Sequence, residues 1–178
     1  MKKYLIFVFP LLLLLAYCHK PPEPEPNPEP DLPAATQEGK GTIGCYINGK
    51  PWVPKPYIAI AIPQFMEVVF DENRNSFFGM QVQKDGSLQE SLSVFAYGAK
   101  IGNNLIVPHN GAAFFDSSDK NKCKGSNYFL DTTTNRLLII TKLDTEKRII
   151  SGTFEFTAIS DKCKDTLKFT KGRFDANF

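Results

Sequence analysis

Long hydrophobic segments and helical periodicity are both missing from this chain of 178 residues. Its longest apolar run, residues 5–16, is too short for a membrane-spanning helix, which needs ~20 residues. Beyond residue 39, apolar side chains recur at every second position in short runs broken by turn residues. This spacing is typical of antiparallel sheets. The sequence therefore excludes a helical bundle and predicts a small β-rich domain.

The residue patterns that hydrolytic enzymes and metal sites require are also missing. No GxSxG motif occurs, and His109, the one histidine beyond residue 38, lies in a Pro-His-Asn-Gly loop. The carboxylates fall mostly in predicted turns, where Asp caps and solvates the chain. No CxxC pair offers a zinc site, and Lys120 opposes a cation in the oxygen-rich loop 116–121. We therefore predict no catalytic residue, no metal and no cofactor.

The N-terminus has the parts of a bacterial signal peptide. Two lysines precede the apolar run, which ends on Leu-Ala-Tyr-Cys at residues 15–18. These four residues resemble the lipobox of bacterial lipoproteins, whose Cys is diacylglycerylated, becomes the mature N-terminus and is acylated on its amine with a fatty acid such as palmitate. Tyr17 departs from that pattern, which has a small residue there. We expect a signal peptide over residues 1–17 and lipidation of Cys18; ordinary secretion is the alternative.

Residues 18–38 are rich in proline and glutamate and contain few apolar side chains. Such a segment buries no core and favours extended structure of ~3.1 Å per residue, so we expect a tether; a disordered leader is the alternative. His19 stands where the inner-membrane retention signal has Asp, and the acidic residues that follow resemble an export signal of lipoproteins. We therefore expect the outer membrane, with the periplasmic face and the cell surface both open.

Residues 39–178 form one all-β domain on this interpretation, an antiparallel β-sandwich or a barrel-like sheet of about ten strands. Asn48-Gly49 and Asp85-Gly86 are hairpin signals. The last strand changes its apolar face after Phe169, which predicts a β-bulge at Gly172. The irregular stretch 99–125 is where we expect binding residues. That stretch contains two short apolar runs, 105–107 and 112–115. The predicted strands cover residues 41–47, 50–53, 57–62, 65–71, 76–84, 90–98, 127–131, 136–143, 148–159 and 166–177.

With Cys18 lipidated, three cysteines are left, which predicts one disulfide and one free thiol in an oxidising compartment. Cys45 lies on the apolar face of a predicted strand, whereas Cys123 and Cys163 lie in Lys-rich loops. If the last four strands form a meander, those loops lie at opposite ends of the sheet, beyond the ~7 Å that Cα atoms of a disulfide allow. We therefore favour Cys45 paired with one loop cysteine, leaving the pairing open; full reduction is the alternative.

Four motifs in this order resemble a family of Bacteroidetes outer-membrane lipoproteins with a C-terminal β-rich domain of unknown function. The motifs are TIGCYINGKPWVP, LLIITKLD, ISGTFEFTA and the terminal KGRFDANF. The resemblance covers residues 40–178 and implies one β-rich lipoprotein domain. It implies no catalytic or ligand residue, and the matching positions have structural interpretations. Trp52 would cover the core, and Arg173 would pair with Asp175 across the bulge.

The predicted function is non-enzymatic binding or interaction at a membrane surface reached through the N-terminal lipid. Aromatic side chains commonly hold sugars, so we single out Trp52, Tyr57, Tyr97 and Tyr128 as candidate ligand-contacting residues; core packing is the competing role. A glycan-binding accessory protein of a sugar-uptake system is one alternative. A purely structural envelope component with a protein partner is another. The formal net charge of +2 is too small to predict a nucleic-acid partner.

Overall fold

The computed structural model describes the chain from Glu29 onward, with short gaps. The described residues are 29–55, 58–59, 62–63, 65–84, 89–107, 111–118, 123 and 125–178. The predicted signal peptide, Cys18, Tyr57 and His109 lie outside these ranges. In the described part of the chain, no helix has the length and apolar character needed to cross a membrane.

The described residues form β-strands and one short 3-10 helix, Glu72–Arg74. Where one strand was predicted over residues 57–62, the described residues Ile58–Ala59 and Ile62–Pro63 form two short strands that pair antiparallel. The strands are β1 (Thr42–Ile47), β2 (Lys50–Trp52), β3 (Ile58–Ala59), β4 (Ile62–Pro63), β5 (Met66–Asp71), β6 (Phe77–Gln83), β7 (Glu90–Ala96), β8 (Gly102–Leu105), β9 (Ala112–Asp116), β10 (Ser126–Leu130), β11 (Leu137–Asp144), β12 (Ile149–Ser160) and β13 (Thr166–Asn177).

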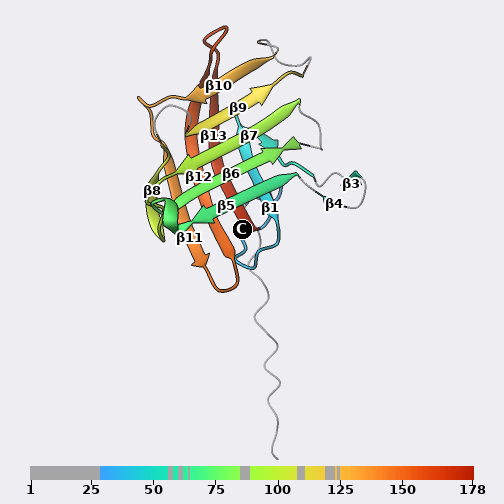
Figure 1. Ribbon diagram of the computed structural model, residues 1–178. Coiled ribbons are helices and arrows are strands. Elements are labelled where there is room, and N and C mark those ends of the chain that lie inside the picture. Colours follow the sequence, from blue (N-terminus) through green and yellow to red (C-terminus); the bar gives the residue numbers. More distant parts are fainter. Residues whose placement is uncertain are drawn as a thin grey trace, which may run out of the picture.

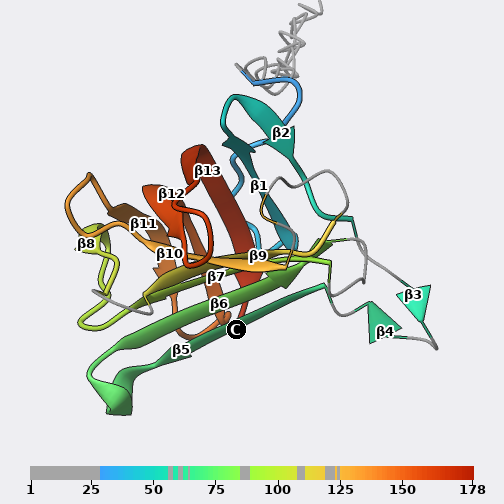
Figure 2. The ribbon, with the colours of Figure 1, turned by 90° about the horizontal axis from the view of Figure 1, so that it is seen from above.

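The predicted all-β fold is confirmed. One curled antiparallel sheet runs in the order β2-β1-β13-β12-β10-β9-β7-β6-β5, while β11 pairs with β12 and with β8. The curl brings the two ends of the sheet face to face, as in a half-open barrel or a sandwich. Figure 1 shows β5, β6, β7, β9 and β10 crossing in front of β11, β12 and β13, and Figure 2 shows the same strands as two layers.

β12 is the strand at which the two layers meet. One edge of β12 pairs with β13 along nearly its whole length. On its other edge the first half pairs with β11 and the last three residues pair with β10, so β10 and β11 run in the same direction, one behind the other. The chain therefore keeps its direction along the edge of β12 through residues 131–136, and no hairpin reversal separates β10 from β11. Asp131 shapes this segment by accepting hydrogen bonds from the amide and the hydroxyl of Thr133, at 2.9 and 2.6 Å.

This path corrects the predicted disulfide. Because β10 pairs antiparallel with the end of β12, the loop before β10 and the loop after β12 lie at the same end of the sheet. Cys123 and Cys163 form the disulfide there, with Cα atoms 6.2 Å apart. The predicted pairing of Cys45 with a loop cysteine is wrong, since it assumed a reversal between β10 and β11. Cys45 is a free, fully buried thiol, and burial raises its pKa to about 12.

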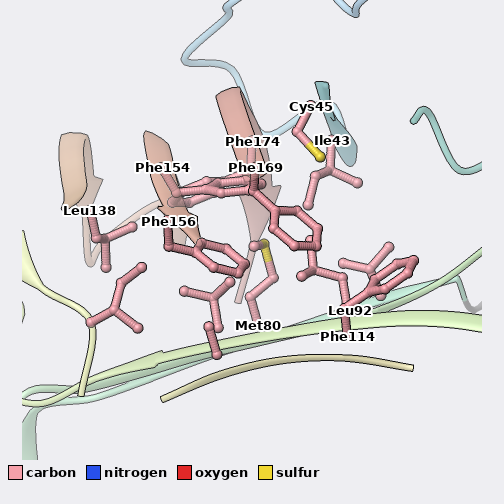
Figure 3. Close-up of a cluster of buried hydrophobic side chains, with 14 of the residues drawn as sticks. Ile43, Cys45, Met80, Leu92, Phe114, Leu138, Phe154, Phe156, Phe169 and Phe174 are labelled. Carbon is pink, nitrogen blue, oxygen red and sulfur yellow. The ribbon is translucent and has the colours of Figure 1, made fainter. Parts of the chain in front are cut away.

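The core lies between the two layers and is rich in phenylalanine. Phe156 and Phe169 stack with ring centroids 4.4 Å apart, and Phe78 stacks on Phe174 across the layers at 5.4 Å. Figure 3 shows these β12 and β13 side chains pointing toward Met80 and its neighbours on the opposite layer. Burying such a side chain contributes roughly 1.5–3 kcal/mol, so the alternation of apolar residues fixes which face of each strand points inward.

The predicted bulge in the last strand is confirmed beside Gly172. Pairing shifts between Phe154–Gly172 and Phe156–Phe169, so two residues of β13 oppose one residue of β12. Lys171, one residue earlier than predicted, has the left-handed φ of 50°. Gly172 is required for close packing rather than for its backbone conformation, because a Cβ atom there would lie 2.5 Å from ring carbons of Phe154.

Residues 29–40, here called the strap, pack against the outer face of β1 and β13. Leu32 is only 3% exposed, and Pro33 lies so close to Gly44 that a Cβ atom on Gly44 would be 2.7 Å from Pro33 Cδ. Glu29 accepts hydrogen bonds from Arg173 at 3.0 Å and Lys171 at 2.8 Å. The expected tether boundary at residue 38 is therefore wrong, since the packed domain already includes Glu29.

Asp175 fastens the second half of the strap, although the sequence predicted that it pairs with Arg173. Its side chain is 1% exposed. Burial raises its pKa, but the hydrogen bonds that it accepts outweigh burial and lower the pKa to about 2. The donors are the hydroxyls of Thr36 and Ser151 and the backbone amides of Glu38, Gly39 and Lys40. Arg173 and Asp175 thus each hold the strap rather than each other.

Candidate functional site

A groove of about 480 Å³ opens beside the β1–β2 hairpin. Figure 2 shows this hairpin next to β13 and close to β9. The groove is lined by residues of these strands together with the first residue of β7 and the middle residue of β10. Ligand pockets usually measure ~300–1,000 Å³, so this groove has the size of a small-molecule site.

The floor of the groove is aromatic and is built from three strands that the sheet curl brings together. Trp52, Phe114 and Tyr128 come from β2, β9 and β10 and are at most 3% exposed. Trp52 meets Phe114 edge-on at 5.9 Å, and Phe114 meets Tyr128 at 6.4 Å. Trp52 reaches this position because it pairs with the buried Cys45 on β1. These contacts fix the floor before a ligand arrives.

The rim of the groove is charged and carries both signs. Glu90 accepts hydrogen bonds from Trp52 Nε1 at 2.8 Å and from Lys84 Nζ at 3.0 and 3.2 Å. Asp116 lies directly opposite Glu90 because β7 and β9 pair in that register. Asp165, just before β13, accepts a hydrogen bond from the Tyr128 hydroxyl at 3.3 Å. Lys50 also lines the groove.

The disulfide lies next to this rim. Cys163 precedes Asp165 by two residues, and Cys123 belongs to the loop that follows Asp116. The backbone of that loop returns to β9, since Gly125 N donates to Asp116 O at 2.9 Å. The cross-link therefore fixes the two chain segments that carry two of the rim carboxylates.

The structure separates the predicted ligand-contacting residues. Trp52 and Tyr128 both belong to the groove floor, where each ring contacts Phe114. Tyr97 is 54% exposed on the outer face of β6 and β7, where its ring lies 5.3 Å from that of Phe77. Tyr57 falls outside the described residues. Trp52, Tyr97 and Tyr128, the described members of the set, do not form one aromatic surface.

Sequence reasoning missed the charged rim. Asp165 lies in a predicted turn, so it was expected to be a turn carboxylate, and Glu90 was not singled out. The only local signal for Glu90 is its position as the first residue of a strand after a hairpin turn, which is common in any β-protein. The irregular stretch 99–125 was expected to carry binding residues, and of the described residues in it, Phe114 and Asp116 line the groove.

Comparison with known proteins gives no match: no family model, no curated protein and no solved structure matches the chain. The resemblance of residues 40–178 to Bacteroidetes lipoproteins therefore stays a prediction. Within the described residues, no group of three His, Cys, Asp or Glu side chains is placed to hold a metal ion. The interpretation of the groove rests on its own geometry and chemistry.

Proposed function

We propose that this protein is a lipid-anchored, non-enzymatic binding module of the outer membrane whose ligand occupies the groove. The observation that carries the proposal is the pre-formed concave site, in which an aromatic floor is surrounded by fixed polar groups. Such a combination is the usual composition of a ligand pocket. Because Trp52, Glu90 and Lys84 already hold one another, little side-chain ordering is left for the binding step, which favours affinity.

The strap supports a short attachment to the membrane. Glu29 is held on β13 by Arg173 and Lys171, so only residues 19–28 separate the packed domain from the proposed lipid on Cys18. A segment of that length spans at most ~36 Å. The groove would then lie within reach of molecules at the membrane surface.

The membrane attachment has a direct test. Mass spectrometry of the N-terminal peptide should find Cys18 as the mature N-terminus, with a diacylglyceryl group on sulfur and an acyl chain on nitrogen. Cys18→Ser should move the protein from the membrane fraction to the soluble fraction. An unmodified Cys18 in the membrane-associated protein would contradict the proposal.

The ligand site has a built-in reporter, because Trp52 is the only tryptophan of the chain. Full-length protein in detergent micelles is titrated with small ligands of different classes: neutral oligosaccharides, sugar phosphates, uronic acids, polyamines and fatty acids. At least one class should shift the Trp52 emission saturably. A structural envelope component without a small ligand predicts no response to any class, and that result would overturn the proposal.

A further inference from the structure

The charges in the groove argue against an ionic ligand. The described lining contains three carboxylates, Glu90, Asp116 and Asp165, and two lysines, Lys50 and Lys84, and Lys84 pairs with Glu90 at 3.0 Å. An anionic ligand would face these carboxylates, and this lining contains no arginine that could grip a phosphate or carboxylate with two parallel hydrogen bonds. A cationic ligand would face the two lysines. Among the described residues the two signs nearly balance, which matches a ligand without net charge.

A purely apolar ligand is also a poor match. Ile47, Pro51 and Leu167 supply apolar wall, but the rim places charged groups around them. An acyl chain lying in the groove would remove water from Glu90 and Asp165 and return no hydrogen bonds. The free energy lost for each such group is on the order of 1–3 kcal/mol. The groove therefore requires a ligand that carries polar groups around an apolar body.

We infer that the groove binds a short uncharged oligosaccharide, which rests on the proposed function because it names the ligand class of the same site. A sugar ring has C–H faces that pack on Leu167 and on the edges of Trp52. Its hydroxyls both donate and accept, so a saccharide can donate to the acceptor-only carboxylate of Asp165 and accept from the ammonium of Lys50. A di- or trisaccharide corresponds to the volume of about 480 Å³.

This arrangement differs from a surface of exposed aromatic rings, the role for which the sequence offered Trp52, Tyr97 and Tyr128 as candidates. Trp52 and Tyr128 are at most 3% exposed, so their ring faces cannot stack on a sugar. The polar residues of the rim would therefore bind the sugar hydroxyls, and Asp165 is the residue best suited to a substitution test. It is exposed, and its only hydrogen bond inside the groove within the described residues comes from Tyr128. Asp165→Asn keeps the shape and removes the charge and part of the acceptor capacity.

The test compares three forms of full-length protein in detergent micelles: wild type, Asp165→Asn and Tyr97→Ala, the last as a control on the outer face. Each is titrated with neutral di- and trisaccharides of glucose, mannose, xylose and N-acetylglucosamine, and with glucose 6-phosphate, digalacturonate, putrescine and octanoate. We expect a saturable shift of Trp52 emission with a neutral saccharide. Its Kd should weaken at least tenfold in Asp165→Asn and stay unchanged in Tyr97→Ala.

The outcomes separate the two proposals. If a charged or acyl ligand shifts the emission and no neutral saccharide does, the saccharide inference is wrong while the groove remains a binding site. If no ligand shifts it, both are overturned. If a neutral saccharide binds equally well to wild type and Asp165→Asn but not to Tyr97→Ala, the saccharide lies on the outer face and the inference fails. Unchanged melting temperatures of the variants show that each loss is local.

Discussion

Trp52 Nε1 donates a hydrogen bond to Glu90 Oε2 at 2.8 Å, across 38 residues of sequence. The bond joins the edge strand β2 of one layer to the first residue of β7 in the other. A buried indole N–H needs an acceptor, and no apolar neighbour can supply one. The same contact therefore stabilises the curl of the sheet and shapes the floor of the groove.

Replacing Glu90 should cost more than replacing its ion-pair partner. Glu90→Ala leaves the Trp52 N–H without its acceptor, and we expect a loss of about 1–3 kcal/mol in the free energy of unfolding. Lys84→Ala removes the partly exposed ion pair with Glu90, which contributes ~0–1 kcal/mol. Urea unfolding of both variants makes the comparison. Equal losses would show that the indole hydrogen bond contributes nothing beyond the ion pair.

The cysteine assignments predict how many thiols react. In the native protein Cys45 is fully buried and burial raises its pKa to about 12, so a thiol reagent should label none of the three domain cysteines. In denaturant without reductant it should label Cys45 alone, because Cys123 and Cys163 are paired and the proposed lipid would block Cys18. Reduction should add two thiols. A second reactive thiol before reduction would show that Cys18 is not lipidated, and three would show that the disulfide is absent.

Asp175 predicts a specific loss of stability in acid. Its folded pKa of about 2 lies below its ordinary value of 3.8. The stabilisation, roughly 2 kcal/mol, is therefore complete above pH ~4 and is lost as pH falls toward 2. Asp175→Asn should remove this part of the pH dependence when the free energy of unfolding is measured from pH 6 to pH 2. Identical pH profiles for variant and wild type would mean that Asp175 does not hold the strap.

Leu32 tests whether the strap belongs to the folded domain. Leu32 is 3% exposed and Leu105 is 65% exposed, so the same substitution can be compared at the two sites. Leu32→Ala should cost about 2–3 kcal/mol, whereas Leu105→Ala should stay within roughly 0.5 kcal/mol. Thermal unfolding of both variants gives the answer. If the two variants melt alike, residues 29–40 behave as the tether that composition alone predicted.

Local patterns predicted the fold class and most strands, because alternation of apolar residues depends only on neighbouring positions. The bulge beside Gly172 followed from the same rule. The prediction of the disulfide pairing was wrong because the Thr-rich segment after Asp131 looks like a reversing turn. The direction of the chain after β10 is decided only by the pairing of β10 and β11 along the same edge of β12. The predicted end of the tether at residue 38 was wrong for a similar reason. Leu32 and Glu29 pack there because Gly44 and the sequence-distant Arg173 form the surface that receives them.

The candidate site was predictable only in part. Trp52 stood out as the single tryptophan after a hairpin turn, and Tyr128 as an aromatic residue in an alternating strand. Nothing near Glu90 or Asp165 in sequence indicates that they surround Trp52, since that depends on the curl of the whole sheet. Tyr97 was also singled out from the sequence, but it is exposed on the outer face of β6 and β7, away from the groove.

The most direct test of the groove as the ligand site is nuclear magnetic resonance of the full-length protein in detergent micelles. The single indole N–H resonance of Trp52 and the backbone resonances of Leu167 and Asp165 are followed during titration with a neutral trisaccharide. We predict saturable shifts at these three residues and none at Tyr97. Shifts gathered around Tyr97, with Trp52 unmoved, would contradict the account.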